Sequence, residues 1–192
     1  MKFFLYVPGM AFDGNFFKKP GFSLGGSETM GYYVAKGLVA KGHQVFVFCN
    51  LPDSPAPREV KGVKYISIGK TSQQTPFGDN WERFAQSMPF DVLLGQRAPG
   101  LMAKPYNSKM NYFWTHDLAL KRFQGHINAQ LWNTNKILAV SEFHRKQICE
   151  TYGVAEEFSG VLPNGIDLNL WDLKKANSAE DKKAGKIMFY SH

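Results

Sequence analysis

Three segments decide the fold of this chain: Lys2-Phe-Phe-Leu-Tyr-Val7, Gly25-Gly26-Ser27-Glu28 and Val45-Phe-Val-Phe-Cys49. The first and last are short, apolar and rich in residues that favour strands. The middle segment holds a glycine pair, and a helical pattern follows it. Together they predict a strand–helix–strand unit whose crossover loop opens onto the N-terminus of a helix.

The helix of this unit is expected to begin at Ser27, which caps it, and to end at Gly42. Glu28 falls in its first turn, where the helix dipole favours a negative charge. Its apolar residues recur at the three- and four-residue spacing of one buried helical face. They are Met30, Tyr33, Val34, Gly37 and Leu38.

Gly25 and Gly26 are candidate ligand-binding residues because of their place before this helix. Exposed backbone N–H groups there suit a phosphate or a sugar hydroxyl, and glycine lets a ligand approach the backbone closely. The alternative is a flexible turn. A dinucleotide site is disfavoured, since the G-x-G-x-x-G spacing is missing.

Length and charge set broad limits. The chain has 192 residues, which suits one domain with a sizeable core, or one domain and a fragment of another. Its net charge of +7 is consistent with surface solvation, or with attraction to phosphorylated ligands or an anionic membrane face. Nucleic acid is not expected as a partner, because basic runs and RNA-binding motifs are missing. No metal is expected, because histidines and carboxylates do not cluster at ligand spacing.

The cysteines and the apolar runs indicate a cytoplasmic protein. Cys49 and Cys149 are expected to be buried free thiols in a reducing compartment. The opening apolar run is too short for a signal peptide, and no apolar stretch approaches the roughly 20 residues that span a bilayer.

Strand and helix patterns alternate along the rest of the chain. Further strands are expected at 64–68, 89–94, 110–114, 136–140 and 158–162. Helices are expected after Asp79, which caps the first of them, at 98–103, in a Gln- and Asn-rich stretch that ends near 133, and from the cap Ser141 to Tyr152, where Gly153 ends the helix. The pattern predicts an α/β fold: a Rossmann-like, mostly parallel sheet with helices on both faces. In such sheets ligands bind beyond the carboxyl ends of the strands. The residues there are Gln96-Arg97, Thr115-His116-Asp117, Ser141-Glu142 and Asn164-Gly165.

The last residues suggest a domain boundary. Residues 1–173 are predicted to form the Rossmann-like domain, and the charged segment 174–186 a linker. Residues 187–192 are expected to be the first strand of a second domain.

Several of these segments together resemble the N-terminal, acceptor-side half of a glycosyltransferase of the GT-B fold, in the large retaining group often called family 4. The matching residues are Gly25-Gly26-Ser27-Glu28, Gly42-His43-Gln44-Val45, His116-Asp117, Ala139-Val140-Ser141-Glu142-Phe143 and Pro163-Asn164-Gly165-Ile166-Asp167, in the family's order. The resemblance covers nearly the whole chain.

The resemblance implies an activity: transfer of a sugar, with retention, from a nucleotide diphosphate sugar to a saccharide or glycolipid acceptor. Polysaccharide or lipopolysaccharide biosynthesis would be the setting. No cofactor is implied beyond the donor substrate. The family carries most of the nucleotide-sugar site on its C-terminal domain, so the isolated chain is expected to be inactive. The alternative function is a non-catalytic Rossmann-like binding module or subunit.

By the same resemblance, His116 is the catalytic candidate. It would hydrogen-bond the transferred sugar and position it, rather than act as a general base, and Asp117 beside it is a further binding candidate. Arg97 follows a strand and suits either a phosphate or a carboxylate such as Asp91. Ser141, Asn164 and Gly165 are further donor- or acceptor-binding candidates. Capping alone also explains Ser141, and Asn164-Gly165 suits a tight turn, which in the family faces the interdomain cleft.

The loop at residues 12–22 interleaves aromatic residues with Lys18 and Lys19. Together with Phe16 and Phe17, these lysines suit an anionic membrane surface or a lipid-linked acceptor, which would place the protein peripherally at the inner face of a membrane. The alternative is that the rings fold onto the core.

Overall fold

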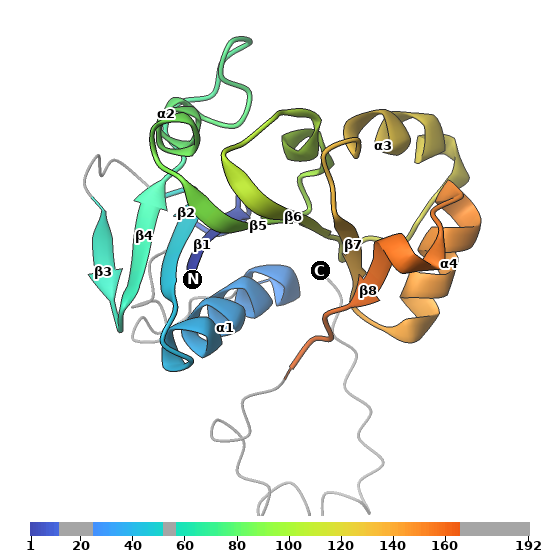
Figure 1. Ribbon diagram of the computed structural model, residues 1–192, viewed down its shortest axis with the longest axis horizontal. Helices are drawn as coiled ribbons and strands as arrows, with labels where there is room; N and C mark the ends of the chain where they lie inside the picture. Colours follow the sequence, from blue (N-terminus) through green and yellow to red (C-terminus); the bar gives the residue numbers. More distant parts are fainter. Residues whose placement is uncertain (12–24, 52–56, 166–192) are drawn as a thin grey trace, which may run out of the picture.

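The computed structural model describes residues 1–11, 25–51 and 57–165. Within these residues one eight-stranded sheet is covered by helices, as Figure 1 shows. The strands are β1 (Lys2–Val7), β2 (Gln44–Cys49), β3 (Arg58–Val60), β4 (Val63–Ser67), β5 (Phe90–Gln96), β6 (Ser108–Trp114), β7 (Lys136–Ala139) and β8 (Ser159–Val161). The helices are α1 (Gly26–Ala40), α2 (Asp79–Ser87), α3 (Gln124–Gln130) and α4 (Glu142–Tyr152), with 3-10 turns at Pro99–Ala103, Lys121–Phe123 and Glu156–Phe158.

The sheet order is β3-β4-β2-β1-β5-β6-β7-β8, and every neighbouring pair is parallel except β3 with β4. The seven strands expected from the sequence are confirmed, with ends shifted by a few residues at most. Sequence reasoning missed β3. Its three residues, Arg-Glu-Val, are too polar and too short to resemble a strand, and pairing with β4 makes them one.

Alternate residues of the central strands face opposite layers, as the pleat requires. Leu5 and Val7 of β1 pack with Met30, Tyr32 and Ala35 of α1 in one core cluster. Phe4 and Tyr6 face the other layer, which α2, α3 and α4 cover through Trp81, Ala85, Ile127, Ile148 and Tyr152. The predicted fold, with helices on both faces, is therefore confirmed (Figure 1).

Two predicted helix caps are wrong. Gly25, not Ser27, is the N-cap of α1, and the Ser27 hydroxyl donates instead to Glu28 Oε2 at 2.9 Å. Gly78 precedes α2, and Asp79 is its first residue; the Asp79 carboxylate accepts from Lys70 N–H at 3.0 Å. In both cases a glycine at the turn allows the chain to enter the helix one or two residues earlier than the polar side chain suggested.

The ends of α4 follow the sequence prediction. Ser141 Oγ accepts from His144 N–H at 3.1 Å, so Ser141 is the N-cap. Gly153 ends the helix in the left-handed conformation, with φ of 70°. Ser141 therefore has a complete structural explanation as a cap.

Strand order reverses between β1 and β5. The chain leaves β1 through α1 toward β2 on one side, whereas β6, β7 and β8 follow β5 on the other side. In open parallel sheets this switch point is where the loops after two neighbouring strands diverge and leave a crevice at the carboxyl edge. The residues after β1 and β5 are therefore the first to consider for a site.

Several expectations fall partly or wholly outside the described residues. These are the linker at 174–186, the strand at 187–192, and the loop side chains Phe16, Phe17, Lys18 and Lys19. Cys49 is a buried free thiol, as expected, but Cys149 is only partly buried. In the described part of the chain, no helix has the length and apolar character needed to cross a membrane.

Candidate functional site

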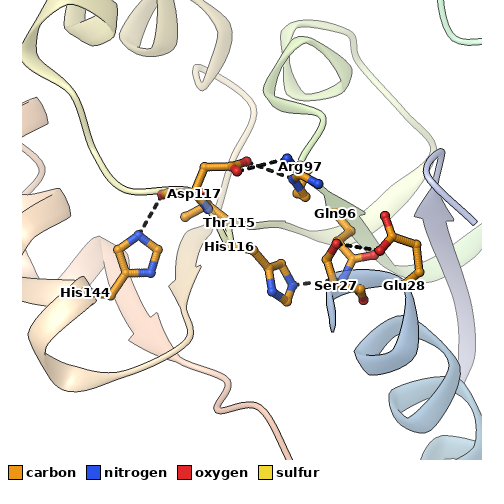
Figure 2. Close-up of polar contacts among 8 residues, drawn as sticks. All are labelled: Ser27, Glu28, Gln96, Arg97, Thr115, His116, Asp117 and His144. Atoms are coloured by element: carbon orange, nitrogen blue, oxygen red, sulfur yellow. Dashed lines mark hydrogen bonds and ion pairs between the residues drawn. The ribbon is translucent and has the colours of Figure 1, made fainter. Parts of the chain in front are cut away.

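The two loops at the switch point are joined by one side chain, Gln96, the last residue of β5. Its Nε2 donates to Ser27 O in the first turn of α1 at 2.7 Å, across 69 residues of sequence. The same nitrogen lies 2.9 Å from Nε2 of His116. Gln96 is 2% exposed, so it links the first turn of α1 to His116 from inside the protein (Figure 2).

His116 lies two residues beyond the end of β6, at the same sheet edge as the glycine pair. Its ring lies against that of Trp114, with centroids 4.4 Å apart. The expectation that His116 and Gly25-Gly26 share one edge is confirmed by the contact through Gln96. A position on the opposite edge would have separated them by the length of the strands.

The surroundings of His116 disfavour its protonation. The pKa of the imidazole is lowered from 6.5 to about 4, chiefly by burial and next by the positive charge of Arg97. Asp117 and Glu28 act in the opposite direction, and His144 adds a small lowering effect. His116 is therefore an uncharged ring at neutral pH, able to donate one hydrogen bond and accept another.

The low pKa of His116 predicts a pH dependence of stability. Between pH 6.5 and about 4 the unfolded chain binds the proton and the folded chain does not, so the free energy of unfolding falls as the pH falls through this window. Exchanging His116 for Gln should make this fall shallower. Urea titrations at several pH values measure it, with His126→Gln as a control at an exposed histidine. Equal slopes for the two variants would contradict the prediction.

Arg97 forms a two-pronged ion pair with Asp117 across the same edge. Its Nε and one terminal nitrogen each lie 2.9 Å from a different carboxylate oxygen (Figure 2). The carboxylate that pairs with Arg97 is Asp117 rather than Asp91. Asp91 instead pairs with Lys109. Arg97 has a positive φ of 52°, which turns the chain sharply after β5.

A buried histidine supports the loop that carries His116. His144 of α4 is 3% exposed, and its Nε2 donates to Asp117 O at 2.9 Å. Its Nδ1 accepts from Val140 N–H at 3.4 Å. The Asp117 backbone is held a second time by Thr115, whose hydroxyl oxygen contacts Asp117 N and O at 3.3 Å. The turn after β6 is thus fixed by side chains from two elements.

The Glu28 carboxylate lies close to Gly9 and Gly25, where neither glycine has a side chain. A Cβ at Gly25 would lie 2.2 Å from one Glu28 carboxylate oxygen, and a Cβ at Gly9 would lie 2.2 Å from the other. A side chain at Gly25 would therefore displace the Glu28 carboxylate from its place beside the loop. Gly26 is exposed, and no atom of the part of the chain that the structure describes lies within 4 Å of a Cβ position there.

The remaining candidates lie around this centre. Gly165 N–H contacts Met30 Sδ of α1 at 3.2 Å, which brings the end of the described chain to the same helix. Asn164 beside it is exposed. The structure thus brings five candidates together at the carboxyl edge of the sheet: Gly25, Gly26, Arg97, His116 and Asp117. Gly165 lies against α1. Ser141 is the cap of α4, three residues before His144.

Sequence reasoning foresaw no contact within this site for three of its residues: Gln96, His144 and Glu28, of which Glu28 was noted for the helix dipole. Gln96 was noted only for its position after a strand. The available signal was a polar residue ending an otherwise apolar run, Phe90-Asp-Val-Leu-Leu-Gly-Gln96. His144 gave no local signal, because it looks like any residue in the first turn of a helix.

The carboxyl edge of the sheet carries both hydrogen-bond donors and hydrogen-bond acceptors. It offers the His116 ring, the open backbone at Gly26, the carboxylates of Glu28 and Asp117, and Arg97 held by Asp117. Donors and acceptors side by side suit hydroxyl groups, which do both. Among the residues that the structure describes, no group of three or more His, Cys, Asp or Glu is placed to hold a metal ion.

A cavity of about 420 Å³ lies elsewhere, between α3 and the end of α4. Its lining includes Trp132, Ile137, Tyr152 and Phe158. Ile137 is the second residue of β7 and Tyr152 ends α4, so this cavity is at the amino edge of the sheet, away from His116.

Comparisons with known proteins agree with this fold. The family model of Glycosyltransferase Family 4 matches residues 24–170, most of the chain. This α/β chain therefore belongs to Glycosyltransferase Family 4. A search of curated proteins finds no match.

Among solved structures, a glycosyltransferase from Rickettsia africae ESF-5 is similar in fold. The TM-score is 0.53 and the sequence identity 18%, over 94% of this chain and 47% of that one. The chain thus spans about half the length of that protein.

Proposed function

We propose that this chain is the acceptor-side half of a GT-B glycosyltransferase that transfers a sugar, with retention, from a nucleotide diphosphate sugar to a saccharide or glycolipid. The observation that carries the proposal is the meeting of α1 and His116 through Gln96 at the switch point. Family membership supplies the class of reaction. The choice of donor and the retention follow from the resemblance described above.

The charges at the edge favour sugar hydroxyls over phosphate at this half of the site. Glu28 and Asp117 are acidic, Arg97 is already paired, and the low pKa of His116 keeps its ring uncharged at neutral pH. A diphosphate placed directly here would meet the Glu28 carboxylate. We therefore assign the sugar to the described edge and the diphosphate to the facing domain that the family carries.

In this mechanism the chain positions its ligand. The His116 ring donates to a sugar oxygen, and the open Gly26 backbone lines the same crevice. Holding the reacting groups in the orientation that the reaction needs lowers the activation barrier, because the entropy cost of reaching that orientation is already met on binding. The proton of the incoming hydroxyl goes to the donor phosphate, as the resemblance implies.

Apolar side chains beside the site fit an acceptor with a lipid part. Leu118, Leu120 and Phe143 are exposed by 62%, 41% and 74%. Ala119 N–H donates to Gln147 on α4, so the segment of Leu118 and Leu120 lies along the helix whose first turn holds Phe143. Lys121 and Arg122 follow directly. The same proposal includes peripheral contact with an anionic membrane, to which Phe16, Phe17, Lys18 and Lys19 would contribute.

The test is a transfer assay on the full-length gene product. A panel of nucleotide diphosphate sugars is incubated with saccharide and glycolipid acceptors, and release of the nucleotide diphosphate is followed together with product. We expect turnover with one donor class and a product of unchanged anomeric configuration by NMR. Inversion would contradict the retaining mechanism. Binding of a donor without turnover on any acceptor would favour the non-catalytic module.

A further inference from the structure

Within residues 1–11, 25–51 and 57–165, the protein engages only one of the two ring nitrogens of His116. Nε2 lies 2.9 Å from the amide nitrogen of Gln96. No hydrogen bond from Nδ1 to any other described residue is found. Which nitrogen carries the proton is set by the bond that the other one makes.

The orientation of the Gln96 amide decides which ring nitrogen of His116 carries the proton. Its Nε2 is 2.7 Å from Ser27 O, and a carbonyl oxygen only accepts, so the atom facing it must be the donor. Turning the amide over would place Oε1 against Ser27 O, two acceptors in contact. The second hydrogen of the same NH2 group then points to His116, and Nε2 of the ring must accept it.

Packing prevents Gln96 from leaving this position. Its side chain is 2% exposed and lies beneath α1. A Cβ at Gly31 of α1 would be 3.2 Å from Gln96 Oε1 and 3.1 Å from Val7 Cγ1. Glycine at 31 thus gives the helix the close approach that holds Ser27 O over the amide.

We infer that Gln96 is a positioning residue that holds His116 as the Nδ1–H tautomer, so that the site offers its ligand a single uncharged hydrogen-bond donor. The groups around the ring are consistent with this state. Arg97 and His144 oppose protonation, and Asp117 and Glu28 favour it less strongly than burial disfavours it. The free Nδ1–H fits a neutral acceptor oxygen, such as a hydroxyl or ring oxygen of a sugar. A charged imidazolium would instead favour phosphate.

The identity of that oxygen as part of a sugar rests on the proposed function, whereas the tautomer does not. The first experiment therefore needs no ligand. The 192-residue chain is labelled with ¹⁵N-histidine, and long-range ¹H–¹⁵N spectra assign the protonated nitrogen of each ring at neutral pH. His116→Asn identifies the His116 signals by their loss. We expect Nδ1 to be protonated and Nε2 not. A proton on Nε2 would overturn the inference.

The variant Gln96→Glu tests whether Gln96 sets the tautomer of His116. A carboxylate at this place accepts from Nε2–H, so the ring should gain a proton on Nε2, and its titration midpoint should rise by about 1–3 pH units. The matched control is Gln130→Glu, since Gln130 lies 2.9 Å from Nε2 of the exposed His126. That control should leave the His116 spectrum unchanged. An unchanged His116 tautomer and midpoint in folded Gln96→Glu would show that Gln96 does not set them.

Gln96→Met removes both hydrogen bonds and keeps a similar volume. Here we expect a mixture of the two neutral tautomers, and a pure Nδ1–H ring would contradict the inference. If a variant does not fold, the spectrum of the unsubstituted chain still decides the tautomer. An Nδ1–H ring in a protein without sugar transfer would contradict the proposed function and leave this inference standing.

Discussion

Replacing His116 by alanine is expected to lower kcat/KM for sugar transfer by about 10²-fold or more. The ring is half-buried between Trp114 and Gln96 and presents its open nitrogen at the switch point. A donor fixed in advance at a water-poor site stabilises a transition state far more than the same donor does in water. Steady-state kinetics on the full-length protein, with the donor and acceptor that the assay above identifies, measure the loss.

His126→Ala is the matched control, since His126 is exposed on α3 and bonds only to Gln130 among the described residues. It should change kcat/KM by less than about 2-fold. Circular dichroism of His116→Ala must show the same fold as the unsubstituted protein. Full activity in a folded His116→Ala would remove His116 from the mechanism and, with it, the role assigned to this edge.

Replacing Trp81 by alanine is expected to lower the free energy of unfolding by about 3–5 kcal/mol. Trp81 is 0% exposed in the layer beneath α2. Its ring contacts Tyr6, Phe48 and Tyr106, with centroids 4.9 to 5.5 Å apart. Alanine would leave a cavity between β1, β2 and α2 that these rigid rings cannot fill. The whole free energy of unfolding of a domain is about 5–15 kcal/mol, so the expected loss is a large part of it.

Trp132→Ala provides the comparison. Trp132 is 62% exposed, and its Nε1 donates to Ala103 O at 3.1 Å. Its removal should cost about 1 kcal/mol or less, the net value of one exposed hydrogen bond and a little contact area. Urea unfolding followed by circular dichroism measures both. Similar losses for the two tryptophans would mean that the layer under α2 is not the packed core described here.

The two histidines of the site show how far sequence reasoning reaches. His116 was found because it follows a strand, and parallel strands bring such residues to one edge whatever their order. His144 was missed because its role depends on Asp117 O, 27 residues away in a loop whose course no local pattern predicts. Arg97 was identified, but its partner among the available carboxylates was not.

The N-caps of the helices show that sequence reasoning has the same limit between residues that are close in the chain. Ser141 was correctly predicted to cap α4, since its hydroxyl meets an N–H only three residues ahead. Ser27 and Asp79 looked equally suitable as caps, yet Gly25 and Gly78 are the N-caps of α1 and α2. A Cβ at Gly78 would lie 2.1 Å from Ile68 O, so the contact that requires glycine there is made to another element.

The sequence by itself determined the alternation of strands and helices, the glycine pair before α1, the cap and end of α4, and the family to which these belong. All of these depend on neighbours within a few residues, where side-chain spacing and backbone preference act directly. The tertiary structure alone decided the strand order and its switch point, the short strand β3, the Arg97–Asp117 pair, and Gln96 between Ser27 and His116. These contacts join residues that are 20 or 69 positions apart, except within the β3–β4 hairpin. Such pairs form only once the sheet has set its register, because a hydrogen bond requires its two atoms within about 3 Å of each other.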